Sequence, residues 1–577
     1  MLLKLCIDSS TQECSFFKTD VMEMFNIENI PFLSNFSPGK NKLFNQDIFN
    51  YENDTNSIKI YDSSTRNSQH LPGILKIDKT FGKFKNKLLY RCIPDDKRLP
   101  HFLIYYNIPA NFSKVNTPFY ILFSFDNWDY LHPYGIVKQN LGRIDVLPNF
   151  YEYILYCKSL QISNSKFNKI TNQVLKQQTH QEWINNMVEK NKNIIDRRNN
   201  YYIFSIDGST TNDYDDAIGL KDNVLSIYIS NVAIWLDNLD LWDAFSKRVS
   251  TIYLPNHKRN MLPNILSDDL CSLIKKKDKI ALTMDIYFNE TNETINIEKI
   301  EYKNCLIRLK ENFIYESDSL LNNSHYNKIL SIVHKLNKND LFIHNIRNSY
   351  DLISYLMIFM NYKTSIFLKK EKIGIFRKLE HSYDSKKYEN IDISDDDKQF
   401  IFLYHSNCAQ YCKHDDSIYN SFMYNNIKQY THITSPIRRL VDLLNSITLQ
   451  KKLNILQFSS NKGISFYENW VNDLEYINLM MRCIRKVQNN CNIFSKIENS
   501  ENKLVCKGLC FDGIDRNNKM KMYNVFIKEL NYVGKISISN EYAEKYKITD
   551  FKYYNFEIYL FLNEENMKKK VKLKIHE

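Results

Sequence analysis

The stretch that decides the fold of this chain is Phe204-Ser-Ile-Asp-Gly-Ser-Thr-Thr-Asn-Asp-Tyr-Asp-Asp-Ala-Ile-Gly-Leu220, where four aspartates fall within ten residues. They are Asp207, Asp213, Asp215 and Asp216. Carboxylates this close repel one another, and the apolar residues on either side indicate partial burial, which increases the cost of their charge. Because a bound cation would relieve that repulsion, the stretch predicts a divalent-metal site.

Magnesium suits this set of hard oxygen ligands. It usually binds one or two carboxylates together with water and substrate phosphates, and two such ions can clamp both oxygens of a phosphoryl displacement. Phosphodiester hydrolysis is therefore the leading chemistry, with an acidic surface loop as the alternative. A calcium loop of the EF-hand type is excluded by spacing. With Asp213 as its first ligand, Ile218 would replace the turn glycine and Val224 the bidentate glutamate.

Three further motifs follow in order: Arg248-Val-Ser-Thr-Ile-Tyr-Leu254, Met261-Leu-Pro-Asn-Ile-Leu-Ser-Asp-Asp-Leu-Cys-Ser-Leu273 and Tyr430-Thr-His-Ile-Thr-Ser-Pro-Ile-Arg-Arg439. Together with the aspartates they resemble the ribonuclease II and ribonuclease R family, over the extent of its catalytic RNB domain at residues 195–498. The resemblance implies a processive 3′→5′ exoribonuclease that uses Mg²⁺ and releases nucleoside 5′-monophosphates from single-stranded RNA.

The resemblance extends upstream. Residues 88–100 and 126–142 resemble the second cold-shock domain of the eukaryotic branch, whose members are exosome-type catalytic subunits. Residues 41–48 are similar to the end of the first cold-shock domain. No room remains in front for a separate endonuclease domain, so the expected architecture is the form that lacks it. The expected partners are single-stranded RNA and an exosome-like or other RNA-processing complex.

The chain's 577 residues favour several domains over a single core. The expected fold is multidomain α+β, with a central RNB domain flanked by OB-fold β-barrels. The predicted domains are an atypical first cold-shock-like domain at 1–70, a second with its connector at 71–190, the RNB domain at 195–498 and a C-terminal OB-type RNA-binding domain at 501–577.

Periodicity supports this division. Short aromatic and β-branched runs favour β-barrels up to about residue 190, and residues 178–200 predict a polar helical connector. From about residue 325 the apolar spacing becomes helical, and from 501 it returns to alternation and ends in a basic run at 567–574. The apolar stretch at 352–368 contains Asn361 and Lys363, so it suits a buried helix better than a membrane span.

The resemblance also implies residue roles. All four aspartates stand where the family has its metal-binding acids, and Asp215 would help orient the attacking water. Arg438 occupies the position of the arginine that faces the scissile phosphate, where a planar guanidinium stabilises developing charge. An arginine that only pairs near a helix start is the alternative.

The predicted RNA-binding residues are Tyr253, Tyr315, Ser435 and Arg439. The two tyrosines fall where the family places aromatics near the RNA end, because stacking holds single-stranded bases. In a chain with 39 tyrosines, a core or surface role is the alternative for either. Arg439 is expected to bind a backbone phosphate. Trp128 is expected to be a buried barrel residue, with an RNA platform as the alternative.

Three departures from the family pattern leave an inactive RNA-binding or scaffold protein as the second hypothesis. Ser354-Tyr355 replace a glutamate pair, residues 422–427 replace a His- and Gly-containing stretch, and Arg482 lies in a helix that lacks the acidic or amide residue of relatives. The complete aspartate set favours the active enzyme.

Composition adds two expectations. A net charge of +11 and a pI near 8.8 fit a polyanionic partner, or only a soluble Lys-rich protein. The 12 scattered cysteines indicate a reducing intracellular compartment, cytoplasmic or nuclear. Four zinc-capable side chains, His405, Cys408, Cys412 and His414, lack regular zinc-site spacing, and packing on a helix face is the preferred interpretation.

Overall fold

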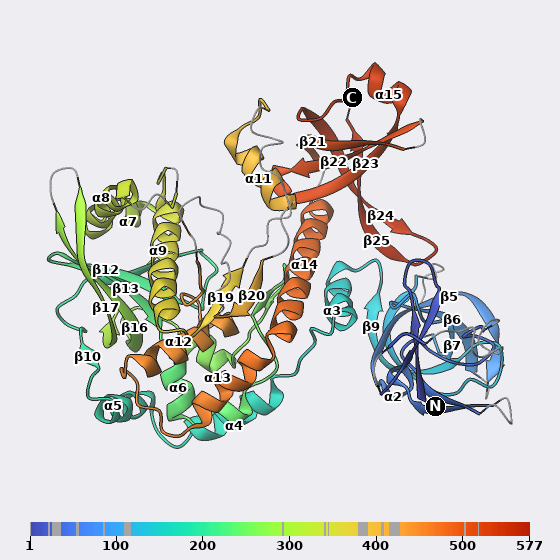
Figure 1. Ribbon diagram of the computed structural model, residues 1–577, viewed down its shortest axis with the longest axis horizontal. Helices are drawn as coiled ribbons and strands as arrows, with labels where there is room; N and C mark the ends of the chain where they lie inside the picture. The colour runs from blue at the N-terminus through green and yellow to red at the C-terminus, as the bar shows by residue number, and fades with distance from the viewer. Residues whose placement is uncertain are drawn as a thin grey trace. The chain divides into compact units, whose positions relative to one another are not determined.

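The computed structural model describes residues 2–20, 23–25, 36–52, 57–84, 87–108, 117–290, 294–339, 342–343, 345–378, 391–405, 409–414, 427, 429–500, 504–516 and 519–576. The chain forms two compact units (Figure 1). The first comprises Met1–Gln161, Leu254–Asn256 and Val487–Glu577, and the second Ile162–Tyr253 and His257–Lys486.

The first unit begins with a four-stranded sheet in the order β2-β1-β3-β4. Its strands are β1 (Leu2–Ile7), β2 (Cys14–Lys18), β3 (Ile48–Glu52) and β4 (Ser57–Asp62). Leu3, Leu5 and Ile7 alternate onto the buried face of β1, as the twofold periodicity of a strand requires. A short helix, α2 (Ser64–Asn67), follows.

A closed barrel comes next, in the order β5-β6-β7-β9-β8. Its strands are β5 (Leu71–Phe84), β6 (Lys87–Pro94), β7 (Phe102–Tyr105), β8 (Phe119–Phe125) and β9 (Tyr134–Arg143). Trp128 is buried and stacks on Phe44, with their ring centroids 4.8 Å apart. The barrel role expected for Trp128 therefore agrees with its burial.

The unit ends in a five-stranded sheet in the order β23-β22-β21-β24-β25. The strands are β21 (Leu504–Arg516), β22 (Met520–Ile527), β23 (Tyr532–Ser539), β24 (Tyr553–Asn563) and β25 (Lys568–Ile575). A side chain at Gly534 on β23 would meet Leu573 on β25 at 2.4 Å, so this glycine lets the two edge strands approach. The sheet thereby curls towards a barrel.

Helices occupy part of the region where alternation predicted only β-structure. They are α3 (Leu147–Cys157), α4 (Ser165–Leu175) and α5 (His180–Lys190). The barrel prediction was wrong for α3 and α4, whereas α5 lies within the predicted helical connector. Thr179 and Glu182 form a capping box at the start of α5, which satisfies two backbone N–H groups.

The second unit is built on a seven-stranded sheet in the order β10-β17-β16-β13-β12-β11-β18. The β10–β17 and β11–β18 pairs are parallel and the other pairs antiparallel. The strands are β10 (Ile195–Asp196), β11 (Ile203–Asp207), β12 (Asp216–Lys221), β13 (Val224–Ser230), β16 (Asp278–Glu290), β17 (Ile295–Arg308) and β18 (Glu311–Ile314).

Buried side chains of the sheet and of neighbouring helices share one extensive hydrophobic core cluster, and the helices that lie beside the sheet can be followed in Figure 1. The predicted helical stretch from residue 325 is α8 (Ser324–Asn339), whose Ile329, Ile332, Val333 and Leu336 are all buried as expected. The stretch at 352–368 lies in α9 (Ser349–Lys370). Among the described residues, no helix combines the length and apolar character that crossing a membrane requires.

The second unit also contains α6 (Val232–Asn238), β14 (Ile252–Tyr253), β15 (Lys258–Arg259), α7 (Asp318–Leu321), β19 (Ile375–Lys378), α11 (Asp395–His405), β20 (Gln410–Lys413), α12 (Leu440–Lys452) and α13 (Lys462–Asn472). Helices α12 and α13 follow the Tyr430–Arg439 motif. Helix α14 (Leu474–Glu498) runs on to the boundary at residue 487 and past it.

Candidate functional site

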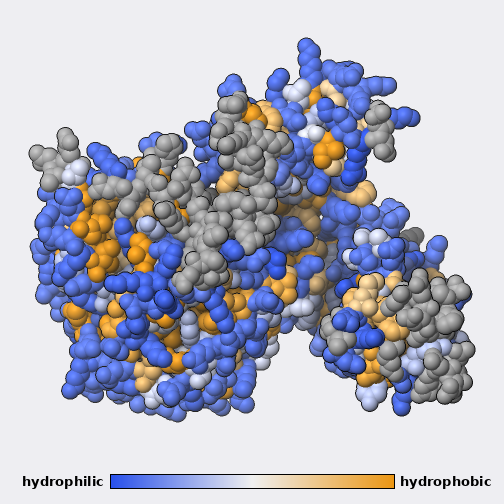
Figure 2. All heavy atoms as spheres, viewed as in Figure 1, coloured by the Kyte–Doolittle hydropathy of each residue, from blue (hydrophilic) through white to orange (hydrophobic). Residues whose placement is uncertain are grey.

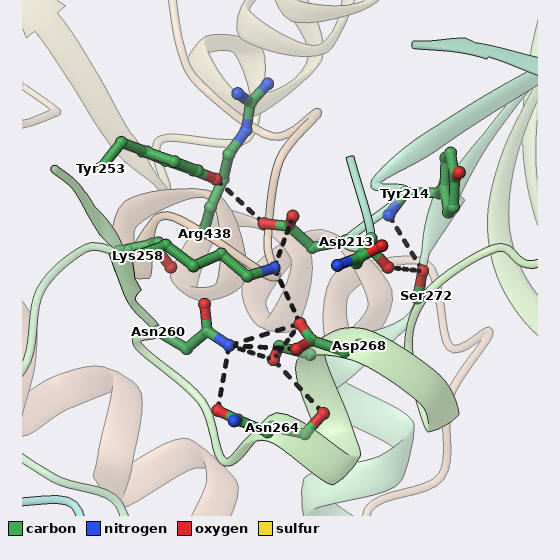
Figure 3. Close-up of polar contacts among 12 residues, drawn as sticks. Asp213, Tyr214, Tyr253, Lys258, Asn260, Asn264, Asp268, Ser272 and Arg438 are labelled. Carbon is green, nitrogen blue, oxygen red and sulfur yellow. Dashed lines mark hydrogen bonds and ion pairs between the residues drawn. The ribbon is translucent and has the colours of Figure 1, made fainter. Parts of the chain in front are cut away.

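The aspartates lie where two neighbouring strands meet a loop. Asp207 ends β11 and Asp216 begins β12, and these strands pair antiparallel. The loop between them is fixed by Ser272, whose Oγ accepts from Tyr214 N at 3.0 Å and donates to Asn212 O at 2.8 Å (Figure 3). The second sequence motif therefore positions the loop that carries Asp213 and Asp215.

The third motif reaches the same loop from far along the chain. Ile437 N donates to Asp215 Oδ1 at 2.9 Å, across 222 residues of sequence. Arg438 Nε lies 3.1 Å from Asp215 Oδ2. The backbone of Asp215 is held as well, because Ser230 N donates to its carbonyl oxygen at 2.8 Å. The structure thus brings together the predicted aspartate and the predicted arginine.

Asp213, Asp215 and Asp216 are buried and Asp207 is partly buried. Burial raises the pKa of Asp215 to about 8 and those of Asp207 and Asp216 to about 7, and repulsion between neighbouring carboxylates adds to each. Asp207 Oδ2 accepts no hydrogen bond from any described residue, and Asp215 Oδ2 is paired with Arg438 Nε without a hydrogen bond. A buried anion with so few partners is costly, so these groups favour a further cation beside them.

The fit to a metal ion depends on oxygens from outside the protein. Within the described ranges, no three His, Cys, Asp or Glu side chains gather into a ready-made metal site. Magnesium does not need one, because it completes its octahedral shell with water and substrate phosphates. Asp207 Oδ2 and Asp215 Oδ2, which accept no hydrogen bond from a described residue, suit this kind of ion, while the four-aspartate ligand set stays a prediction.

Asp213 has a different environment from the other three aspartates. Lys258 Nζ lies 2.9 Å from Asp213 Oδ1, and the Tyr253 hydroxyl donates to Asp213 Oδ2 at 2.9 Å (Figure 3). Lys258 Nζ is also 2.9 Å from Asp268 Oδ1. Neither Lys258 nor Asp268 was identified from the sequence. Lys258 is brought to the site by its pairing with the predicted Tyr253 across strands β14 and β15.

Arg438 is fixed through its backbone, while much of its side chain is open. Its carbonyl oxygen accepts from Thr251 N at 2.9 Å and from Ser250 Oγ at 2.8 Å. Its side chain is 46% exposed, and Nη2 donates to Ser435 Oγ at 3.0 Å. A guanidinium held beside a carboxylate and partly open to solvent can contact an anionic ligand. Arg438 also pairs with Asp215 two residues before α12 (Leu440–Lys452) begins, so pairing near a helix start stays the alternative.

The other two predicted residues of this motif are more enclosed. Ser435 is buried, and its backbone N–H donates to Asp442 Oδ1 at 2.8 Å. Arg439 Nη2 lies 2.8 Å from the same oxygen. Asp442 therefore holds the turn that presents Arg438. RNA contacts by Ser435 and Arg439 stay predictions.

Both predicted tyrosines lie beside the aspartates. Tyr253 is 38% exposed and bonded to Asp213 as described above. Tyr315 N donates to Asp207 O at 3.0 Å, and burial together with the charges of Asp216 and Asp207 raises the pKa of the Tyr315 phenol. The Tyr315 ring stacks on Tyr350, with centroids 3.8 Å apart and 12° between the planes. Tyr350, which sequence reasoning missed, is 52% exposed.

Of the departures from the family pattern, Tyr355 lies in a supporting position. Tyr355 is fully buried in the core of α9. On the same helix, Asn361 Oδ1 accepts from Ile433 N at 2.9 Å, so α9 supports the segment before the third motif. Residues 422–426 and the zinc candidate Cys408 lie outside the described residues. Among the described zinc candidates, Cys412 lies in β20 and its Sγ contacts Phe376 O at 3.7 Å.

Comparison with known proteins places this geometry in a family. Residues 195–347 match the profile of the RNB domain. Ribonuclease R of Mycoplasmopsis pulmonis is 33% identical over 132 residues, which are 22% of this chain and 17% of that protein. Ribonuclease R of Chlamydia pneumoniae is 29% identical over 140 residues, or 23% and 20% of the two chains. The chain thus matches at most about a fifth of these curated relatives.

Solved structures extend the likeness of the fold to the whole chain. Ribonuclease R of Mycoplasma genitalium, in complex with ribose-methylated single-stranded RNA, has a TM-score of 0.67 at 16% identity and covers 100% of both chains. Yeast Ssd1, a pseudonuclease, has a TM-score of 0.59 at 15% identity, over 93% of this chain and 78% of Ssd1. The predicted fold class, a central RNB domain flanked by OB-type barrels, is confirmed. The domain boundaries and the exosome-like branch stay predictions.

Proposed function

Residues 195–347 of this chain are an RNB domain, and on that premise we propose that the protein is a metal-dependent 3′→5′ exoribonuclease that hydrolyses single-stranded RNA to nucleoside 5′-monophosphates. The observation that carries the proposal is the buried Asp215 and Asp216 with the partly buried Asp207, and Arg438 beside Asp215. Three acids with raised pKa values and one half-exposed guanidinium are suited to bind a divalent cation and a phosphate diester together.

Each side chain has a chemical role in this proposal. Asp207, Asp215 and Asp216 would hold the ion, which supplies Lewis-acid stabilisation of the phosphate when bound. Asp215 Oδ1 is fixed by Ile437 N, and Oδ2, which lies 3.1 Å from Arg438 Nε, would help orient the attacking water. Arg438 would stabilise negative charge that develops on the scissile phosphate. Magnesium and processive action both belong to this proposal.

The stacked tyrosines give the proposal a place for the RNA end. Tyr315 is tied to Asp207 through its backbone, and its ring is extended by Tyr350. Aromatic faces bind bases without reading their sequence, at about 1–3 kcal/mol per stacked base. A 3′-terminal base stacked here would lie beside the carboxylates, which favours removal of terminal nucleotides over internal cleavage.

A second surface, in the first unit, supports a polyanionic partner. On one face of β24 and β25, Tyr559 pairs with Lys572 and Phe561 with Lys570, and both aromatic residues are exposed. Lys572 Nζ also lies 5.9 Å from the centre of the Phe561 ring. Figure 2 shows mostly hydrophilic residues over the C-terminal sheet. Alternating lysines and aromatics suit single-stranded nucleic acid, because the charges track phosphates while the rings stack on bases.

An inactive RNA-binding protein is the second candidate. The observation in its favour is that Asp213 already has a protein cation, Lys258, so the aspartate cluster is partly neutralised without metal. Asp207 Oδ2, which accepts no hydrogen bond from a described residue, favours the enzyme over this alternative. An exosome-like complex and a cytoplasmic or nuclear location complete the proposal, because such a complex would supply intracellular RNA.

A length-resolved degradation assay tests the function. Single-stranded RNA labelled at its 5′ end, incubated with the full chain and Mg²⁺, should shorten stepwise and release monophosphates. EDTA should stop the reaction, and Asp215→Asn should remove it while RNA binding persists. Discrete internal cuts, or equal decay of RNA blocked at its 3′ end, would contradict the proposal. Binding by both proteins without cleavage by either would favour the inactive candidate.

A further inference from the structure

The four aspartates are not equivalent, because only one of them is bonded to a lysine. Asp213 Oδ1 lies 2.9 Å from Lys258 Nζ and its Oδ2 accepts from the Tyr253 hydroxyl at 2.9 Å, so each carboxylate oxygen has a partner. By contrast, Asp207 Oδ2 accepts no hydrogen bond from a described residue, and Asp215 Oδ2 is paired with the half-exposed Arg438, whose Nε lies 3.1 Å away, without a hydrogen bond. The lysine therefore distinguishes Asp213 from the other three aspartates.

Lys258 is held in place from two sides. Its ammonium is 2.9 Å from both Asp213 Oδ1 and Asp268 Oδ1, and its side chain is 23% exposed. Asp268 is itself fixed, since Ser267 Oγ donates to Asp268 Oδ1 at 2.8 Å and Asn260 Nδ2 donates to it at 3.3 Å (Figure 3). A lysine confined by two carboxylates loses little further freedom when it neutralises one of them, so its charge is preorganised.

We propose that Lys258 is a built-in counter-cation for Asp213, so that Asp207, Asp215 and Asp216 hold the divalent ion while Asp213 acts as a positioning residue for Tyr253. This inference rests on the proposed function, because it concerns the metal and RNA sites of that enzyme. It departs from the expectation that all four aspartates bind metal.

Electrostatics supports this division of roles. An ammonium 2.9 Å from Asp213 Oδ1 repels a second cation at the same oxygen, and the repulsion is strong because the Asp213 side chain is only 6% exposed. The guanidinium beside Asp215 is 46% exposed, against 23% for the Lys258 side chain, so solvent screens its charge more strongly. A divalent ion is therefore favoured at Asp207, Asp215 and Asp216 over Asp213. Lys258 would thus set both the position of the ion and the number of aspartates that bind it.

The same contacts give Asp213 its second role. The Tyr253 hydroxyl donates to Asp213 Oδ2, and Tyr253 pairs with Lys258 across β14 and β15. The ring is 38% exposed, so one end is fixed by the hydrogen bond while the rest stays accessible. A fixed aromatic ring orders a base at a smaller entropic cost than a mobile one. Loss of Asp213 should therefore impair RNA-end binding more than metal binding.

Calorimetric titration of the full chain with Mg²⁺ alone, without RNA, tests the inference. Asp213→Asn should bind Mg²⁺ within about threefold of wild type, whereas Asp215→Asn should bind at least tenfold more weakly. Lys258→Met should bind Mg²⁺ several-fold more tightly, because the released carboxylate becomes a ligand. Lys258→Arg should resemble wild type. The matched control is Lys462→Met, since Lys462 also bridges two aspartates, Asp240 and Asp243, outside this site.

Thermal unfolding in EDTA supplies a second readout. Lys258→Met should lower the Tm, because it leaves Asp213 buried without its cation, and the double variant with Asp213→Asn should recover at least half of that loss. In steady-state degradation, Asp213→Asn and Tyr253→Phe should both raise KM for short RNA more than they lower kcat.

The inference is overturned if Asp213→Asn weakens Mg²⁺ binding as much as Asp215→Asn does, or if Lys258→Met leaves Mg²⁺ affinity unchanged. It is also overturned if the double variant recovers none of the Tm. Failure of the proposed function has a different signature. In that case RNA would not be degraded by any variant, while the differences in Mg²⁺ binding and the recovery of Tm would remain.

Discussion

Replacing Asp215 with asparagine should stabilise the metal-free protein at neutral and alkaline pH, although it abolishes hydrolysis. Asp215 is only 3% exposed, and folding raises its pKa from 3.8 to about 8, first through burial. A carboxyl with a raised pKa binds its proton more tightly in the folded chain. Its contribution to stability is therefore fully present below pH 3.8, decreases as the pH rises and is lost once the pH exceeds about 8.

The magnitude follows from this difference in pKa. At pH 7 the unfolded chain ionises Asp215 and the folded chain mostly keeps it protonated, which costs folding about 4 kcal/mol at about 1.4 kcal/mol per pKa unit. Asparagine retains an oxygen for the hydrogen bond from Ile437 N and does not titrate. The attraction of Arg438 is already part of the pKa of Asp215, so it is not subtracted again, and we expect a net stabilisation of about 4 kcal/mol at pH 7.

Urea unfolding in EDTA at pH 5, 6, 7 and 8 measures this effect. The advantage of Asp215→Asn over wild type should grow across that range, and saturating Mg²⁺ should reduce it by stabilising folded wild type. The control is Asp222→Asn, an exposed residue in the turn between β12 and β13, whose positive φ of 51° asparagine tolerates. A variant less stable than wild type at pH 8, or parallel pH profiles for the two proteins, would refute the reasoning.

Arg438→Ala should slow hydrolysis by about two to three orders of magnitude, the loss of rate expected when one donor to the developing negative charge is removed. RNA affinity should change only a few-fold, and single-turnover kinetics would measure both quantities. Arg438→Lys should restore only part of the rate, because the planar fork is lost; a rate within a few-fold of wild type for Arg438→Ala would remove it from the site. Tyr350→Ala should raise KM for short RNA, because it removes the ring that stacks on Tyr315. Tyr350→Phe keeps that ring and should leave KM unchanged; an equal rise in KM for both variants would contradict the stacking role. Phe561→Ala should weaken binding of single-stranded RNA with an unchanged salt slope, whereas Lys572→Ala should reduce that slope by about one, as fluorescence titrations at several salt concentrations would show.

The helical half of the RNB-containing unit could be predicted well from the sequence. The apolar spacing of residues 329–336 matches one buried face of α8, because amphipathic helices repeat at 3.6 residues. Helix α3 could not be predicted in this way. Its buried Tyr151, Tyr153 and Leu155 follow the spacing of a strand, and only packing in the folded protein makes them helical.

Some residues of the candidate site could likewise be predicted from the sequence, and others could not. The aspartates were identified because their repulsion is visible in the sequence itself, within one short stretch. Lys258 was not, because its partner Asp213 lies 45 residues away and nothing local distinguishes it among 77 basic residues. Tyr350 was missed for the same reason among 39 tyrosines. Long-range partners become visible only when the fold is known.

The hydrogen bond from Ile437 N to Asp215 Oδ1 has a consequence for biosynthesis. During translation the aspartates leave the ribosome 222 residues before the partner that fixes Asp215, so a nascent chain carries the acids long before it can orient them. Contacts this distant in sequence also form late in folding, because they require the closure of a large loop. A chain interrupted before residue 437 would therefore carry all four aspartates and still lack the contact that fixes Asp215.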